Sequence, residues 1–367
     1  MHKQPSDYQH DSIPVTGVLV TNLGSPDAPT PAAVRRYLKE FLWDPRVVEI
    51  PRPLWWLILH TLVLTLRPRK SAQAYRKIWV DAGSPLIVNS QRQCAALQEL
   101  LVKRIKGPVK VVLGMRYGNP SIATALEKLR SANARQIVVL PLYPQHSAAT
   151  TASTLDAIAT TLKDWRRVPD LRFIAQYHDD SGYISALANS IRNFRAAHGS
   201  GEQLMFSFHG MPRRTLLAGD PYHCQCQKTA RLVAEELDLA DDEWIIAFQS
   251  RFGREEWLRP YASDTLASLG KAGLQSIDIV CPGFSADCLE TLEEMALLNK
   301  GVFQQAGGGE YRYIPALNDA DEHIESLAHI ILQNAAGWPG IAHWDTRSAA
   351  EAAQKCAARA IAMGAER

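Results

Sequence analysis

Short apolar runs alternate with amphipathic stretches along most of this chain. Runs rich in β-branched and aromatic residues are typical of buried strands, whereas apolar positions three or four residues apart are typical of helices. Amphipathic stretches such as 121–133 and 226–238 are therefore predicted helices. The predicted strands are 15–22, 109–115, 136–143, 171–177, 203–209, 243–249, 276–281 and 310–316.

The alternation of strands with helices predicts an α/β protein whose parallel sheets are covered on both faces. The strands form two groups of four, so we expect two similar lobes, each built on a four-stranded parallel sheet. A length of 367 residues fits about two domains. We expect a polar N-terminus at 1–14, an N-terminal lobe at 15–167, a C-terminal lobe at 168–344, and an Ala-rich tail at 345–367 that forms a closing helix or a frayed end.

The segment 52–70 interrupts this pattern, because it is almost wholly apolar between Arg52 and Arg67. It is too short to span a bilayer, which takes about 20 apolar residues. A helix buried in the core fits this length, and so does a helix lying at a membrane surface with Trp55 and Trp56 as interfacial anchors. We favour the buried helix and keep peripheral membrane contact as the alternative.

The net charge and the cysteines indicate which partners and which compartment to expect. The formal net charge is only +2 and no long basic run occurs, so a nucleic-acid partner is not expected. The six cysteines are scattered without a disulfide-type spacing, and residues 1–14 lack the apolar region of a signal peptide. A reducing, cytoplasmic setting is predicted.

Polar and aromatic residues follow the predicted strands at their carboxyl ends, where open parallel sheets bind ligands. His209 is the most suggestive of them, because it ends the apolar run "MFSF" and is followed at once by Gly210. A neutral imidazole can accept a proton or bind a metal near physiological pH. A core histidine with satisfied ring nitrogens is the alternative, and the strand-end position favours the functional role.

A second group of candidates lies in "CPGFSADCLETLEEM", residues 281–295, where a helix is predicted to begin near Asp287. Asp287, Glu290 and Glu294 have helical spacing and share one predicted face. Asp287 and Glu290 could form a capping box, which leaves Glu294 as surface. The three carboxylates could instead relay protons or attract a cation, and the residues alone leave both interpretations open.

Several common chemistries are not supported by the motifs present. The sequence has no G-x-G-x-x-G after its first strand, no G-x-x-x-x-G-K-[ST] loop and no G-x-S-x-G elbow. The group His223, Cys224 and Cys226 in "HCQC" is a weak metal signal, because no distant partner pair accompanies it.

Seven motifs together resemble the ferrochelatase family. They are "LVTNLGSPD" (19–27), "YRKIWVDAGSPL" (75–86), "MRYGNPSI" (115–122), "LPLYPQHSAATT" (140–151), "SFHGMPRRTLLAGDPY" (207–222), "FQSRFGREEWLRPY" (248–261) and "CPGFSADCLETLEE" (281–294), which span about 15–340 in family order. The resemblance implies the type II chelatase fold and the final step of haem synthesis. In that step Fe²⁺ is inserted into protoporphyrin IX with release of two protons, and no organic cofactor takes part.

The resemblance also implies roles for the candidate residues. His209 matches the family's active-site histidine, assigned either as acceptor of the pyrrole protons or as a metal ligand. Glu290 matches the essential glutamate that faces it across the macrocycle, and it is the second candidate metal ligand. Asp287 and Glu294 would extend this acidic line as a path for protons or metal.

Further positions match the family's porphyrin pocket. Arg116 and Tyr117 correspond to residues near the opposite face of the porphyrin. Residues from about 30 to 70 correspond to a lip that meets the inner face of the cytoplasmic membrane, from which the apolar substrate arrives. The positions that line or border the pocket are Leu23, Leu38, Phe41, Tyr75 and Trp257.

This chain departs from parts of the family pattern. Animal members hold a 2Fe–2S cluster, but here Ala148 replaces one cysteine ligand and the tail holds only Cys356, so no cluster is predicted. Cys288 stands where many relatives have histidine, and Leu23 mildly favours protoporphyrin IX as substrate. A chelatase that loads cobalt into another tetrapyrrole, and a non-enzymatic haem or metal carrier, are the rival functions.

Overall fold

The computed structural model describes residues 9–253 and 255–366. Part of the predicted polar N-terminus, residues 1–8, lies outside this description. Residues 9–14 belong to no helix or strand.

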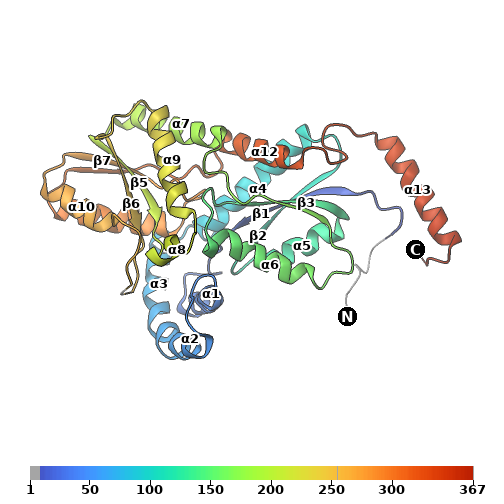
Figure 1. The fold of residues 1–367 in the computed structure, drawn as a ribbon, viewed down its shortest axis with the longest axis horizontal. Helices are drawn as coiled ribbons and strands as arrows, with labels where there is room; N and C mark the ends of the chain where they lie inside the picture. Colours follow the sequence, from blue (N-terminus) through green and yellow to red (C-terminus); the bar gives the residue numbers. More distant parts are fainter. Residues whose placement is uncertain (1–8, 254, 367) are drawn as a thin grey trace.

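Two separate four-stranded sheets form the framework, and every strand pair in them is parallel (Figure 1). The first sheet has the order β2-β1-β3-β4 and the second the order β6-β5-β7-β8. The predicted α/β architecture with two similar sheets is therefore confirmed. The strands are β1 (Val15–Asn22), β2 (Val109–Met115), β3 (Ala134–Pro141), β4 (Asp170–Phe173), β5 (Gln203–His209), β6 (Trp244–Gln249), β7 (Ser276–Val280) and β8 (Glu310–Tyr313).

The predicted boundary between residues 167 and 168 is wrong. Strand β4 follows that point, yet it pairs with β3 and completes the first sheet. It is a short edge strand with no buried residue. The division between the two sheets therefore falls after β4, in the stretch that leads to α7.

Helices connect the strands and cover the sheets. Good capping residues begin several of them, as at α7, where the Asp180 carboxylate accepts a hydrogen bond from the Tyr183 N–H at 3.1 Å. The α-helices after the lip are α4 (Pro85–Arg104), α5 (Ile122–Ser131), α6 (Ser153–Leu162), α7 (Ser181–His198), α8 (Arg213–Leu217), α9 (Tyr222–Glu236), α10 (Ala262–Lys271), α11 (Lys300–Gln305), α12 (Asp321–Ala335) and, in the tail, α13 (Thr346–Ala362).

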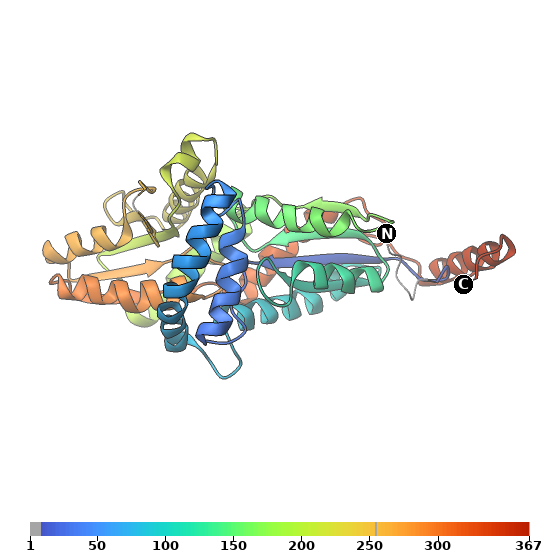
Figure 2. The same ribbon diagram turned by 90° about the horizontal axis from the view of Figure 1, so that it is seen from below.

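The lip consists of α1 (Pro31–Trp43), α2 (Arg52–Ile58), the π-helix η1 (Leu59–Val63) and α3 (Leu64–Ile78). Figure 2 shows its helices crossing the molecule between the two sheets. Trp55 and Leu59 are buried, whereas Trp56 and Leu62 are more than half exposed. The favoured prediction of a helix wholly buried in the core is therefore wrong, because only one side of this segment is covered.

One hydrophobic core extends across both sheets. It joins residues of β1 such as Val18 to residues of β5 such as Phe206, through α4, α7 and α12. The tail forms α13, which has no buried residue and extends away from the body of the protein (Figure 1). This is the helical alternative of the two predicted for the tail. No helix in the described part of the chain combines the length and hydrophobicity needed to cross a membrane.

Candidate active site

His209 ends β5, one of the two central strands of the second sheet. Phe206 and Phe208 before it are fully buried, whereas His209 itself is partly exposed. Its Nδ1 lies 2.6 Å from the carbonyl oxygen of Gly210. A carbonyl only accepts hydrogen bonds, so Nδ1 carries a proton; in the neutral ring the lone pair of Nε2 is then left to act as a base or a ligand.

Gly210 allows a close approach behind this histidine. A Cβ added at Gly210 would lie 2.6 Å from the Gln249 carbonyl oxygen and 3.0 Å from the Trp257 ring. The segment after Gly210 then pairs with the segment around Trp257, through a bridge between Pro212 and Trp257. The structure therefore places Trp257 beside the His209 turn, in the second lobe.

Glu290 and Glu294 lie on η3 (Glu290–Asn299), a π-helix. Both Glu294 oxygens are held by Ser250, whose N–H and hydroxyl donate at 2.6 and 2.5 Å. The Gln249 amide donates to the Glu290 carbonyl oxygen at 2.8 Å. Because Gln249 ends β6, the neighbour of β5, and Ser250 follows it, the sheet fixes the two acidic residues relative to His209.

The structure brings His209, Glu290 and Glu294 into electrostatic contact. Burial raises the pKa of Glu294; the hydrogen bonds from Ser250 and the charge of His209 oppose this rise, and the Glu290 carboxylate adds to it. In the described part of the chain no three His, Cys, Asp or Glu side chains form a group that could hold a metal ion.

Asp287 does not join this acidic pair on the helix face. Its carboxylate is buried and accepts hydrogen bonds from Tyr313 at 2.6 Å, Thr291 at 2.9 Å and Asn318 at 2.8 Å. The predicted capping box is also wrong, because η3 begins without a side-chain cap and has Leu289 at its N-cap position. Both oxygens of this carboxylate therefore accept hydrogen bonds from residues outside the acidic pair.

An aromatic and aliphatic wall faces the acidic pair. Leu23, Leu38, Phe41, Tyr75 and Tyr117 all belong to one hydrophobic cluster between the lip and the end of β2. Phe41 packs edge-on against Tyr117, with ring centroids 5.1 Å apart. The Glu290 carboxylate lies within electrostatic range of Tyr75, and Leu289 beside it packs against the same cluster, so the start of η3 lies next to this wall.

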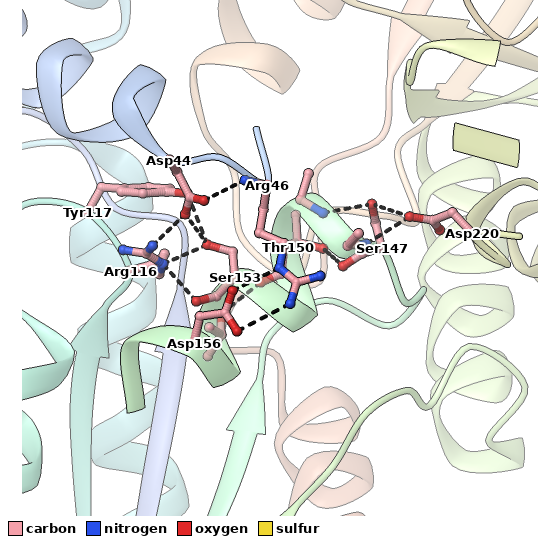
Figure 3. A network of polar contacts seen from close by, with 12 residues as sticks. Asp44, Arg46, Arg116, Tyr117, Ser147, Thr150, Ser153, Asp156 and Asp220 are labelled. Atoms are coloured by element: carbon pink, nitrogen blue, oxygen red, sulfur yellow. Dashed lines mark hydrogen bonds and ion pairs between the residues drawn. The ribbon is translucent and has the colours of Figure 1, made fainter. Parts of the chain in front are cut away.

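Arg116 and Tyr117 hold the end of the lip helix α1 against the first sheet (Figure 3). Both side chains donate to the Asp44 carboxylate, Tyr117 through its hydroxyl at 2.8 Å and Arg116 through its guanidinium. Ser153 donates to the same oxygen at 2.5 Å. Asp44 follows α1, so the network fixes the helix that carries Leu38 and Phe41.

Sequence reasoning missed two residues that the structure adds to the site. Tyr37 is buried between Tyr75, Tyr117 and Glu290, and its spacing of four from Phe41 on α1 is the signal that identifies it. Arg67 lies within electrostatic range of Glu290 and Tyr75 although its side chain is exposed. Its place at the end of the apolar run is the corresponding sequence signal.

The environment of Cys288 does not favour metal binding, and the two cysteines of the "HCQC" group differ in exposure. Burial raises the pKa of the Cys288 thiol, and the neighbouring Glu290 carboxylate raises it further, so the thiol stays protonated and is a poor ligand. In the "HCQC" group, Cys226 is buried and Cys224 is exposed. His223 and Cys224 line a surface hollow of about 680 Å³ along α9.

The chain matches known proteins over nearly its whole length. The family model for ferrochelatase matches residues 15–335. The ferrochelatases of Thioalkalivibrio sulfidiphilus and Nitrosococcus oceani are each 56% identical over 362 residues, which cover 98% of this chain and 98% of each relative. The ferrochelatase of Nitrosomonas europaea is 49% identical over 358 residues, covering 98% of this chain and 97% of the relative.

A solved structure supports the fold independently of sequence similarity. The SirB protein of Bacillus subtilis, determined with Fe³⁺, is 14% identical and superposes with a TM-score of 0.54 over 90% of this chain and 100% of its own. The two parallel sheets are those of the type II chelatase fold. The chain therefore belongs to the ferrochelatase family, the lyases that insert Fe²⁺ into protoporphyrin IX to give protohaem.

Proposed function

We propose that iron insertion takes place between the lip wall and η3, with His209 as the base that accepts the pyrrole protons. Metal insertion releases two N–H protons, so a base must come within hydrogen-bond reach of the ring centre. The observation that carries this assignment is the contact of His209 Nδ1 with the Gly210 carbonyl, because in the neutral ring it leaves the lone pair of Nε2 free to accept a proton. Metal ligation by His209 and Glu290 is the alternative use of the same two side chains.

Glu290 and Glu294 are proposed to take the protons onward from His209. Two carboxyl groups in electrostatic contact share protons readily, since ionising one disfavours ionising the other. Burial raises the pKa of Glu294, which makes this carboxyl a proton acceptor closer to neutral pH. The Ser250 hydrogen bonds hold it in place during the transfer.

The porphyrin is proposed to lie against Leu23, Leu38, Phe41, Tyr75 and Tyr117. A flat apolar disc needs aliphatic and aromatic contacts over its faces and a few cations at its carboxylate edge. The wall supplies the apolar contacts, and Arg67 supplies an exposed cation beside it. Trp257, behind the His209 turn, would close the pocket from the second lobe.

The rival functions are separated by turnover on matched substrates. Purified protein is incubated without oxygen with Fe²⁺ or Co²⁺ and either protoporphyrin IX or a porphyrin with eight carboxylates, and the Soret band is followed. Binding of preformed haem is measured in parallel. We expect multiple turnovers with protoporphyrin IX and Fe²⁺. Preference for Co²⁺ and the carboxylate-rich ring would support the other chelatase, and tight binding of preformed haem without turnover would support a carrier.

The lip is further proposed to contact the cytoplasmic face of a membrane peripherally. Five of its apolar side chains are more than half exposed, and Arg69 and Lys70 follow them. Such a patch inserts into the headgroup boundary while the basic residues meet anionic lipid. The five are Leu54, Trp56, Leu57, Leu62 and Leu66.

Sedimentation with vesicles tests this contact. Leu62→Ser/Leu66→Ser is expected to reduce binding to vesicles that contain anionic lipid, whereas Leu155→Ser, an exposed leucine on α6, is expected to leave binding unchanged. Equal binding by both variants would contradict the proposal.

We also propose that this chain holds no 2Fe–2S cluster. Ala148 begins the short π-helix η2 (Ala148–Ala152) and supplies no thiolate, while Cys356 lies on α13. Protein purified without oxygen is expected to show no iron–sulfur absorption and no acid-labile sulfide. Two iron and two sulfide per chain would refute this.

A further inference from the structure

We propose that Asn318 and Gln93 are positioning residues that fix the start of η3, and that Asp287 is their partner in this clamp instead of a proton relay. The inference rests on the role proposed above for Glu290, which is the first residue of η3. It assigns functions to two side chains that lie outside the acidic line.

The side chain of Asn318 binds both the backbone N–H and the carboxylate of Asp287. Its Oδ1 accepts from the Asp287 N–H at 2.8 Å, and its Nδ2 donates to Asp287 Oδ2 at 2.8 Å. Asn318 adopts a φ of +46°, a conformation that asparagine tolerates better than most residues. The two reciprocal bonds fix the orientation of the Asp287 carboxylate as well as its position.

Asp287 in turn fixes the first turn of the helix. Its Oδ1 accepts from the Thr291 hydroxyl at 2.9 Å, and the Thr291 oxygen accepts from the Cys288 N–H at 3.0 Å. Thr291 is fully buried and directly follows Glu290. A shift of Asp287 would therefore be transmitted to Glu290 through one hydroxyl group.

Gln93 connects this clamp to the first lobe. It lies on α4, is fully buried, and its amide donates to the Ser285 carbonyl oxygen at 2.9 Å and to the Asn318 carbonyl oxygen at 2.9 Å. The Asn318 N–H also donates to the Ser285 carbonyl oxygen at 3.1 Å. One side chain of the first lobe thus holds the loop that carries Ser285 and Asp287 and the loop that carries Asn318.

The clamp links the two walls of the site. The lip wall is built on the first lobe and Glu290 on the second, so their separation depends on groups that bridge the lobes. A displacement of about 1 Å at a reacting group can reduce the rate by about a hundredfold. Directional hydrogen bonds hold such a geometry better than apolar contacts, which tolerate sliding.

Exchanging the side chains of Asp287 and Asn318 distinguishes a positioning role of Asp287 from a role as a proton relay. In Asp287→Asn the new amide would face the Asn318 amide, so one bond of the clamp is lost. In Asp287→Asn/Asn318→Asp the direction of that bond is reversed, while the Oδ1 of residue 287 still accepts from Thr291 and Tyr313. We expect each single substitution to lower kcat about tenfold or more, and the double variant to recover most of that loss.

A relay would give a different pattern, because the double variant has no carboxyl group at position 287. Equal activity of the double variant and Asp287→Asn, with both properly folded, would overturn the proposal. Wild-type kcat in Asp287→Asn would also overturn it, since the clamp would then be irrelevant to the reaction.

Matched controls exclude a general loss of structure. Gln93→Leu is expected to lower kcat with little change in KM for porphyrin, whereas Gln98→Leu, on the same helix but bonded to β2 only, leaves kcat unchanged. Asn133→Gly, at a left-handed asparagine in the first lobe, is the matched control for Asn318→Gly in the second lobe. Equal kcat in Gln93→Leu and Gln98→Leu would count against the clamp.

Failure of the proposed function is distinguishable from failure of this inference. If the wild type does not turn over Fe²⁺ and protoporphyrin IX, the proposed function fails. If it does and the exchange does not restore activity, the clamp alone fails. Thermal unfolding of all variants shows whether the losses of kcat come from lower stability. In that case kcat would fall together with the unfolding temperature, in the control variants as well.

Discussion

Replacing Asp44 with asparagine is predicted to lower the free energy of unfolding by about 3–5 kcal/mol. Asp44 is the centre of the network in Figure 3, where it accepts from Arg116, Tyr117 and Ser153 and from the Arg46 N–H. Asparagine keeps the shape of the side chain but removes its charge. It also turns a donor group toward groups that are themselves donors.

The magnitude follows from burial. The Asp44 side chain is 3% exposed and that of Arg116 is 17% exposed, so their ion pair is largely shielded from water. Removing one partner of a buried pair leaves the other charge uncompensated, which costs about 3–5 kcal/mol. The nearby pair between Arg46 and Asp156 is 42% and 50% exposed, and a pair of that kind contributes at most about 1 kcal/mol.

The pH dependence has a definite sign. Burial alone would raise the pKa of Asp44, but the hydrogen bonds from Ser153, Arg46 and Tyr117, together with the Arg116 charge, outweigh burial and lower it. A carboxyl group whose pKa is lowered by folding stabilises the protein above its unfolded pKa of about 3.9. The difference between wild type and Asp44→Asn should therefore be constant above about pH 4 and shrink below it.

Urea unfolding followed by tryptophan fluorescence measures the effect, with Asp156→Asn as the exposed control. We expect Asp44→Asn to unfold at a clearly lower urea concentration than Asp156→Asn at pH 7. A difference of less than about 1 kcal/mol between the two variants would refute the reasoning from burial.

Three further predictions concern other titratable groups. Burial raises the pKa of Glu294, so its ionised form lowers the stability of the folded protein. Glu294→Gln should therefore unfold at a higher temperature than wild type at neutral pH, and this difference in unfolding temperature should close as pH falls. An unfolding temperature equal to that of wild type at all pH values would contradict this. Lys77→Met leaves the Glu293 carboxylate, which is only 9% exposed, without its partner. This single variant should therefore have a lower urea midpoint than Lys77→Met/Glu293→Gln, which removes the carboxylate charge as well. Equal midpoints of the two variants would contradict this. Burial lowers the pKa of His323 to about 4, so the free energy of unfolding should fall as pH drops from about 6.5 to 4, because the unfolded chain takes up the proton. In His323→Gln most of this decrease should be absent. The same pH profile of stability in the variant and in wild type would contradict the assignment.

The strands were largely predictable because each is a short buried run bounded by turn residues. The ranges predicted for β1, β2 and β5 agree with the structure at both ends. The boundary between the lobes was missed at β4, since a four-residue edge strand without buried residues carries little local signal. Which sheet it joins depends on pairing with β3, and local periodicity does not encode that pairing.

The site was predictable in part for related reasons. His209 stands out because a polar residue at the end of a buried strand is locally visible. The environment of Asp287 was not predictable, because its partners Tyr313 and Asn318 lie 26 and 31 residues away. The π-helical form of η3 was missed as well, since the same apolar spacing suits an α-helix over so few turns.

Turnover of His209→Ala and Glu290→Gln, beside wild type and His223→Ala, tests the central claim most directly. His223 lies on α9 against Phe248, with ring centroids 5.6 Å apart, and serves as a histidine outside the proposed chemistry. With Fe²⁺ and protoporphyrin IX under anaerobic conditions, we expect repeated turnover by wild type and His223→Ala, and abolished or severely reduced turnover by the other two. Unchanged turnover in His209→Ala, with porphyrin still bound, would contradict the assignment of His209 as the base.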